Sequence, residues 1–151
     1  MIFSNSNQLN QAFEAQGRLM ALDVGTKRIG IAISDATRLI ATPKLVLHRQ
    51  SNLKDFEKIK NFISENNIVG IVIGLPVHMD ESEIPMTEFV QKFTKNLNEF
   101  LEEKLPIVFF DERLTSYEAR RIHASELSRK KDEFVDDIAA SVILQHCLDS
   151  L

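Results

Sequence analysis

Acidic residues stand at three well-separated places in this chain, each beside an apolar segment. Asp23 follows an apolar stretch, the pair Asp111–Glu112 follows another, and the pair Asp136–Asp137 opens an apolar helical stretch. A carboxylate at the end of a buried strand is costly to desolvate unless a cation or hydrogen bonds receive it. Carboxylates so far apart in sequence can share one cation only if the fold brings the ends of their elements together.

Carboxylate oxygens are the ligands that Mg²⁺ and Mn²⁺ prefer in proteins. Paired Mg²⁺ ions are a common means of hydrolysing phosphodiester bonds, because they activate the attacking water and stabilise the leaving oxygen. The three acidic places therefore predict a metal-dependent nuclease that uses one or two Mg²⁺ or Mn²⁺ ions.

The hydrophobic pattern predicts the elements that position these acids. Apolar runs rich in β-branched residues predict five strands, over 19–22, 29–34, 40–48, 68–73 and 107–110. Helical periodicity predicts helices over about 52–66, from about 85 to the residues before Pro106, and over about 134–148. A capping box, Thr115 to Glu118, predicts a further helix. The segment 1–17 is expected to be a short helical or disordered extension.

This order of elements predicts an α/β fold with a five-stranded mixed sheet. An antiparallel meander, starting with a hairpin whose turn contains Gly25, is extended by parallel strands, and helices cover both faces. Parallel neighbours place their carboxyl ends at one edge of a sheet, where ligands collect, so Asp23 and Glu112 are expected together. Helical phase puts Asp136 on the side of two alanines that would let its helix pack close to the sheet. Phase favours Asp136 over Asp137 without excluding the latter.

Bulk properties limit the class of protein. The 151 residues fit one domain, which we expect to span 18–151 after the extension 1–17. A single cysteine, Cys147, excludes an internal disulfide and suits a reducing compartment. No apolar run is long enough to span a bilayer, and the first residues lack a signal-peptide pattern. A cytoplasmic protein without membrane contact is therefore expected.

The charged residues argue both for and against nucleic-acid binding. The net charge of −4 argues mildly against a protein that coats phosphate backbones. However, the stretch from Arg113 to Lys131 is locally basic, and acidic metal ligands lower the formal charge of a site that is neutral when loaded. Local charge is therefore the better guide.

Four segments in order closely resemble the YqgF (RuvX) family: 22–30, 74–76, 111–115 and 135–140. The resemblance covers residues 18–148. The family is related to the RuvC Holliday-junction resolvases and is assigned as the nuclease of pre-16S ribosomal RNA. The resemblance implies a ribonuclease-H-like fold and, in this chain, Asp23, Glu112 and Asp136 as the catalytic, metal-binding carboxylates.

Residues beside the acids are candidates for substrate binding. The backbone amides of Gly25 and Thr26, with the side chains of Lys27 and Arg28, are expected to contact phosphate oxygens or the adjacent strand. Arg113 is expected to approach the same phosphate or to orient a carboxylate. The basic stretch 120–131 would hold the nucleic-acid backbone without reading its sequence. The expected partner is structured RNA, with a DNA junction less favoured, and the chain is expected to be a monomer or homodimer.

Each acid also has a plain structural interpretation. Asp23 can form an Asx turn, and Asp111 or Glu112 can pair with Arg113. Asp136 can be an ordinary first-turn acid, because negative charge is favourable at a helix N-terminus.

Three other functions stay open from the sequence. The first is a Holliday-junction resolvase, which needs two active sites in a dimer. The second is a nucleotide-binding module, since Asp-x-Gly-Thr also resembles the phosphate loop of the actin and sugar-kinase fold. The third is an RNA-binding factor that keeps the fold but does not cleave.

Overall fold

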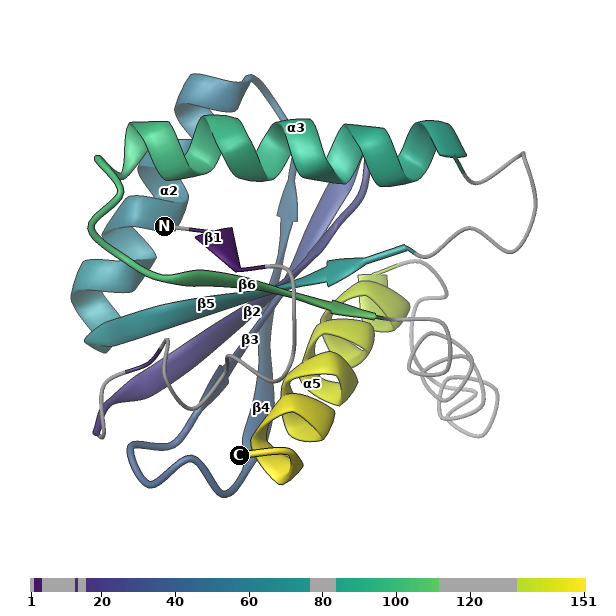
Figure 1. Ribbon diagram of the computed structural model, residues 1–151. Coiled ribbons are helices and arrows are strands. Elements are labelled where there is room, and N and C mark those ends of the chain that lie inside the picture. The colour runs from purple at the N-terminus through teal and green to yellow at the C-terminus, as the bar shows by residue number, and fades with distance from the viewer. Residues whose placement is uncertain (1, 4–12, 14–15, 77–83, 112–132) are drawn as a thin grey trace.

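The computed structural model describes residues 2–3, 13, 16–76, 84–111 and 133–151. They form one sheet with helices on both sides (Figure 1). The strands are β1 (Ile2–Phe3), β2 (Arg18–Val24), β3 (Arg28–Ser34), β4 (Ala41–His48), β5 (Ile68–Leu75) and β6 (Ile107–Asp111). The helices are α2 (Asn52–Asn66), α3 (Ile84–Phe100) and α5 (Glu133–Asp149).

The sheet has the order β1-β6-β5-β2-β3-β4. Strands β2, β3 and β4 form the predicted antiparallel meander. Strand β5 runs parallel to both β2 and β6, so these three strands end at the same edge. The five predicted strands and the mixed sheet are confirmed. Strand β1 adds a sixth, two-residue member beside β6, from a segment for which the sequence favours helix or disorder.

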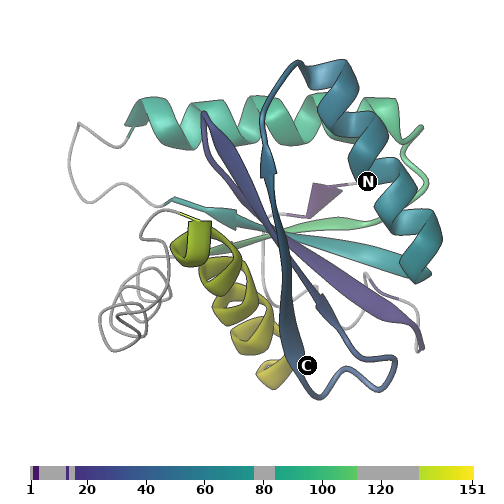
Figure 2. The ribbon, with the colours of Figure 1, turned by 180° about the vertical axis from the view of Figure 1, so that it is seen from behind.

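Helices α2 and α3 cover one face of the sheet, and α5 covers the other (Figures 1 and 2). Alternation along β2 matches these layers, because successive side chains of a strand point to opposite faces. Met20, Leu22 and Val24 pack in the core under α2 and α3, whereas Leu19 and Ala21 pack against α5. The predicted helices on both faces are confirmed.

Helix α2 shows why its predicted and observed ranges agree. The Ser51 hydroxyl accepts a hydrogen bond from the Lys54 N–H at 3.2 Å and caps the first turn. At the other end Asn67 has φ 54°, a left-handed conformation that Asn tolerates and that ends the helix. Between these ends, Phe56 and Ile59 are buried against the sheet.

Several predicted features fall outside the described residues. They are the helix expected at Thr115–Glu118, most of the loop before α3, and the basic stretch 120–131. Within the described parts of the chain, no helix has the length and apolar character needed to cross a membrane.

Candidate active site

Asp23 lies one residue before the end of β2, at the edge of the sheet where β5 and β6 also end. It is half-buried and in phase with Ala21, so it belongs to the face that α5 covers. Its antiparallel partner across the hairpin is Gly30. The predicted position of this acid at a strand end is therefore observed.

Gly30 is the point at which α5 comes closest to the sheet. A Cβ atom added to Gly30 would lie 1.9 Å from the carbonyl oxygen of Asp136 and 2.9 Å from the backbone nitrogen of Asp137. Only a residue without a side chain allows this approach. The side chains of Asp136 and Asp137 are both half-buried there.

Asp23 and Asp136 consequently border the same glycine on the same face of the sheet, although 113 residues separate them (136 − 23). Of the two alanines predicted to bring α5 close, Ala140 is fully buried in the core between α5 and the sheet, whereas Ala139 is buried in a separate small cluster with Ile138. The Asp137 backbone also meets Gly30, so the packing brings both acids of this pair to the site.

Asp111, the last described residue of β6, lies on a different face of the sheet from Asp23. Val108 and Phe110 belong to the core under α5, whereas Ile107 and Phe109 belong to the core under α2 and α3. Asp111 follows in phase with Phe109, and its side chain is exposed. Asp111 therefore lies on the phase opposite to Asp23. Glu112 and Arg113 lie outside the described residues.

Arg28 makes a contact that the sequence did not indicate. Its Nε donates to Oδ2 of Asp136 at 2.7 Å, and the two side chains are 31% and 24% exposed. The sequence interpretation directs Arg28 to phosphate, whereas here it holds a carboxylate of α5. Because the pair is partly shielded from water, it can fix the Asp136 side chain as well as the start of the helix.

The turn between β2 and β3 is tight and presents two residues to solvent. The Gly25 N–H donates to the Arg28 carbonyl at 2.8 Å, and a Cβ at Gly25 would lie 2.8 Å from the same oxygen. Thr26 and Lys27 are exposed at its tip. The turn begins after Val24, so it lies at the same end of β2 as Asp23.

The donor set fits a hard divalent cation in part. Asp23 and Asp136 both lie beside Gly30, and carboxylate oxygens are the kind of ligand that Mg²⁺ and Mn²⁺ prefer. Within the described ranges no cluster of three or more acidic, His or Cys side chains is arranged to hold a metal ion. A third protein ligand would therefore have to come from residues beyond those ranges, where Glu112 belongs.

Cys147 is a core residue of α5. It is fully buried, and burial raises the pKa of its thiol to about 12, with Arg38 opposing this shift. A thiol protonated at neutral pH is no nucleophile.

Comparison with known proteins agrees with this fold. The family model RuvX, described as Holliday junction resolvase, matches residues 17–150. A protein of Cereibacter sphaeroides named putative pre-16S rRNA nuclease is 39% identical, over 100% of this chain and 94% of its own length. A protein of Thermoanaerobacter pseudethanolicus with the same name is 44% identical, over 88% of this chain and 96% of its own length.

Among solved structures, RuvC of Thermus thermophilus in complex with a Holliday junction substrate aligns with a TM-score of 0.54 at 8% identity. The alignment covers 84% of this chain and 91% of that protein. Such a likeness concerns the fold. The mixed sheet with helices on both faces has a ribonuclease-H-like fold.

Within that class, the family match and the near full-length relatives give the narrower assignment. The chain belongs to the RuvX family. The resemblance seen in the four sequence segments is thereby confirmed. The prediction of a nuclease agrees with the names of these relatives.

Proposed function

We propose that this protein is a metal-dependent endonuclease that hydrolyses phosphodiester bonds in structured RNA, in the maturation of pre-16S ribosomal RNA in the cytoplasm. One observation carries the proposal: Asp23 and Asp136 border Gly30 at the edge where β2, β5 and β6 end. The names of the relatives from Cereibacter and Thermoanaerobacter support the choice of substrate.

Asp23, Glu112 and Asp136 would hold one or two Mg²⁺ or Mn²⁺ ions in this proposal. When bound, such ions activate a water for attack on phosphorus and stabilise the leaving oxygen. Alternation along β6 supports Glu112 over Asp111 as the third ligand. Asp111 is out of phase with Asp23, so the next residue of a continuing strand would be in phase.

The cationic and backbone groups have two tasks in this scheme. Arg28 holds Asp136 through its 2.7 Å contact and so orients that carboxylate. The amides of Gly25 and Thr26, with Lys27, would contact the non-bridging oxygens of the substrate phosphate. Arg113 and the basic stretch 120–131 would hold the backbone on either side, which gives affinity without base specificity.

A Holliday-junction resolvase is the second candidate, favoured by the description of the RuvX family model. Cleaving a four-way junction on both sides requires two active sites in a dimer. The same carboxylates would serve either substrate. Substrate preference and oligomeric state therefore separate the two functions.

The decisive experiment compares cleavage of a pre-16S RNA fragment and of a four-way DNA junction, with Mg²⁺ and with Mn²⁺. Wild type should cleave the RNA, and Asp23→Asn should lower the rate about 100-fold or more, the usual scale for impaired metal sites. Asp149→Asn is the control, because it removes an exposed carboxylate at the C-terminal end of α5, whereas Asp136 lies in the first turn of that helix.

Equal cleavage by wild type and Asp23→Asn would contradict the proposal. Cleavage of the junction alone, by a dimer seen in light scattering, would support the resolvase in place of the ribonuclease. Loss of activity in Asp149→Asn as large as in Asp23→Asn would show that the assay does not report on this site.

A further inference from the structure

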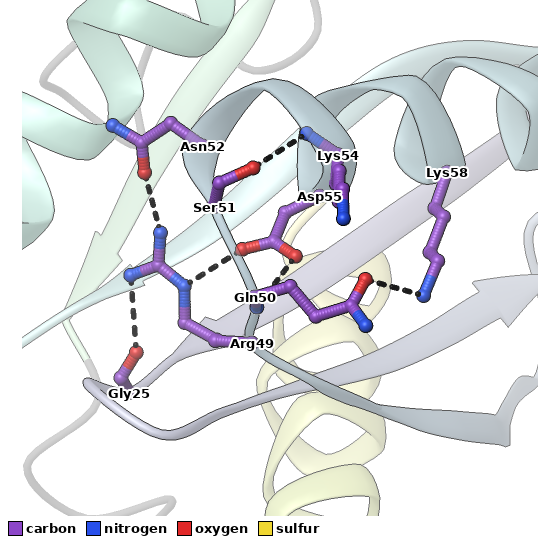
Figure 3. A network of polar contacts seen from close by, with 8 residues as sticks. All are labelled: Gly25, Arg49, Gln50, Ser51, Asn52, Lys54, Asp55 and Lys58. Carbon is purple, nitrogen blue, oxygen red and sulfur yellow. Dashed lines mark hydrogen bonds and ion pairs between the residues drawn. The ribbon is translucent and has the colours of Figure 1, made fainter.

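A buried ion pair lies beside the turn of the candidate site (Figure 3). Asp55, in the first turn of α2, has a side chain that is 0% exposed. Its Oδ2 accepts from Nε of Arg49 at 3.2 Å, and its Oδ1 accepts from the Gln50 N–H at 3.1 Å. The Arg49 side chain is 12% exposed. A charge buried to this degree is held by these contacts and has little freedom to leave them.

The same arginine also reaches across to the turn between β2 and β3. Its backbone N–H donates to the Lys27 carbonyl at 2.9 Å, and its Nη1 lies 3.5 Å from the Gly25 carbonyl oxygen. Its Nη2 donates to the Asn52 side chain at 2.6 Å. Arg49 therefore connects both ends of the turn that follows Asp23 to the start of α2.

Two aromatic rings of α3 complete the surroundings of the guanidinium. Its central carbon lies 5.0 Å from the centroid of Phe93 and 5.6 Å from that of Phe89. Such cation–π contacts are stronger where water is excluded. The Arg49 guanidinium, which follows β4 in the chain, is therefore enclosed by two helices. Helix α2 contributes its counter-ion, Asp55, and α3 contributes the two aromatic rings that pack against it.

We propose that Arg49 is a positioning residue of the active site, which fixes the turn 25–27 relative to Asp23. The inference rests on the proposed nuclease function, in which this turn contacts the substrate phosphate. A purely stabilising role explains less, because replacing a buried ion pair by apolar residues is often neutral or stabilising. The planar, forked guanidinium can serve Asp55, Asn52 and Gly25 at once, which a lysine ammonium cannot do in the same geometry.

The test compares Arg49→Lys with Ile59→Val, a change at a fully buried apolar side chain of α2, the helix that supplies Asp55. Thermal midpoints identify a temperature at which both variants are folded to the same extent. Hydrogen exchange of the amides of residues 25–28, followed by mass spectrometry, then reports on the turn. Cleavage of the RNA fragment gives kcat and KM separately.

Arg49→Lys should speed exchange in residues 25–28 and lower kcat about 10- to 100-fold, with a smaller change in KM, because misplacement of a reacting group acts mainly on the chemical step. Ile59→Val should leave both unchanged. Should Arg49→Lys not fold, Asp55→Asn removes the same ion pair with a nearly isosteric side chain, and the same pattern is expected.

The inference would be overturned if residues 25–28 of Arg49→Lys exchanged their amide hydrogens at the wild-type rate. It would also be overturned if Ile59→Val changed the exchange rate and kcat as much as Arg49→Lys does. Wild-type protein that cleaves nothing would end the proposed function and with it the role of Arg49 in catalysis. The exchange measurement would then still show whether Arg49 holds the turn. The two failures are therefore distinguishable.

Discussion

At the scale of residues, three carboxylates that are partly or fully buried accept hydrogen bonds from specific donors: Asp35, Asp55 and Asp136. Asp55 accepts hydrogen bonds from the Arg49 side chain and from the Gln50 N–H, and Asp136 accepts one from the Arg28 side chain. Asp35, in the turn between β3 and β4, accepts the N–H groups of Leu39 at 2.8 Å and Ile40 at 2.9 Å, and also the Thr37 hydroxyl. Such bonds favour the ionised form of a carboxyl group.

Asp35 gives a prediction for pH dependence. The bond from the Ile40 amide, followed by those from Thr37 and Leu39, lowers the pKa of Asp35 from 3.8 to about 2. A folded-state pKa below the unfolded value stabilises the fold above about pH 4, and this stabilisation is lost as pH falls towards 2. The thermal midpoint of Asp35→Asn should therefore lie below that of wild type at pH 6, and the gap should narrow between pH 4 and pH 2.5.

An NMR titration of the Asp35 carboxyl checks the same point directly. A midpoint near 4 would contradict the assignment of these hydrogen bonds, and so would a gap in thermal midpoints that does not depend on pH.

At the scale of elements, the approach of α5 to β3 decides whether the site exists. Asp136 reaches the end of β2 because Gly30 leaves room for the first turn of α5. The rest of that interface consists of small and apolar residues, among them Ala32, Ala140 and Ile143. The site is therefore assembled by helix packing and not by the sheet alone.

Gly30→Ala tests this packing. The added methyl would have to displace the Asp136 carbonyl, so we expect a loss of about 1–3 kcal/mol in the free energy of unfolding and a cleavage rate lowered about 10-fold or more. Urea unfolding and the RNA cleavage assay measure the two effects.

Gly17→Ala is the matched control for that change. Gly17 has φ +118°, and its Cβ would lie 2.7 Å from Val69, so this substitution is also destabilising. It lies at the opposite end of β2 from Asp23, about 20 Å away at the rise of a strand. Stability should fall in both variants and the cleavage rate of folded protein only in Gly30→Ala. Equal rates in both would contradict the role of Gly30.

The helices and strands also show which structural features can be predicted from the sequence. The range of α2 was predictable because Ser51, the apolar stripe and Asn67 are all local signals. The placement of Asp23 was predictable because a parallel sheet gathers its strand ends at one edge. The close approach of Asp136 to Gly30 was not predictable. A glycine occurs in a strand for several structural reasons, and the residue that meets this one lies 106 residues further along the chain (136 − 30).

The contact of Arg28 with Asp136 and the contacts of Arg49 were not predicted, for a related reason. Arg28 looks like a solvated turn residue until α5 supplies its carboxylate. For Arg49 a signal did exist. Asp55 shares a helical face with Ile59 and Phe62, which pack in or against the core, and an acid on such a face requires a cation nearby.

At the scale of the whole molecule, the segment before residue 18 takes part in the fold at two described places. Ile2–Phe3 pair with β6 as the strand β1, and Phe13 is 6% exposed in the core under α5. A Cβ on Gly70 would lie 2.3 Å from Cδ1 of Phe13, so this ring covers a bare stretch of β5. The division into an extension and a domain at residue 18 stays a prediction.

Phe13→Ala tests whether this segment belongs to the folded unit. Loss of a buried ring and the cavity that it leaves should lower the free energy of unfolding by about 3 kcal/mol. Ile2→Ala, at a side chain that is 38% exposed, should change it by about 0.5 kcal/mol or less. Urea unfolding of both variants gives the comparison. Equal stabilities of Phe13→Ala and wild type would mark residue 13 as dispensable.

In the proposed mechanism, the carboxylates of Asp23, Glu112 and Asp136 together bind one or two divalent cations. Calorimetric titration with Mn²⁺, without any nucleic acid, tests it most directly. We predict binding by wild type and by the Asp149→Asn control, and affinity at least about 10-fold weaker in Asp23→Asn, Glu112→Gln and Asp136→Asn. Mn²⁺ binding that is the same in wild type and in all three of these variants would contradict the claim.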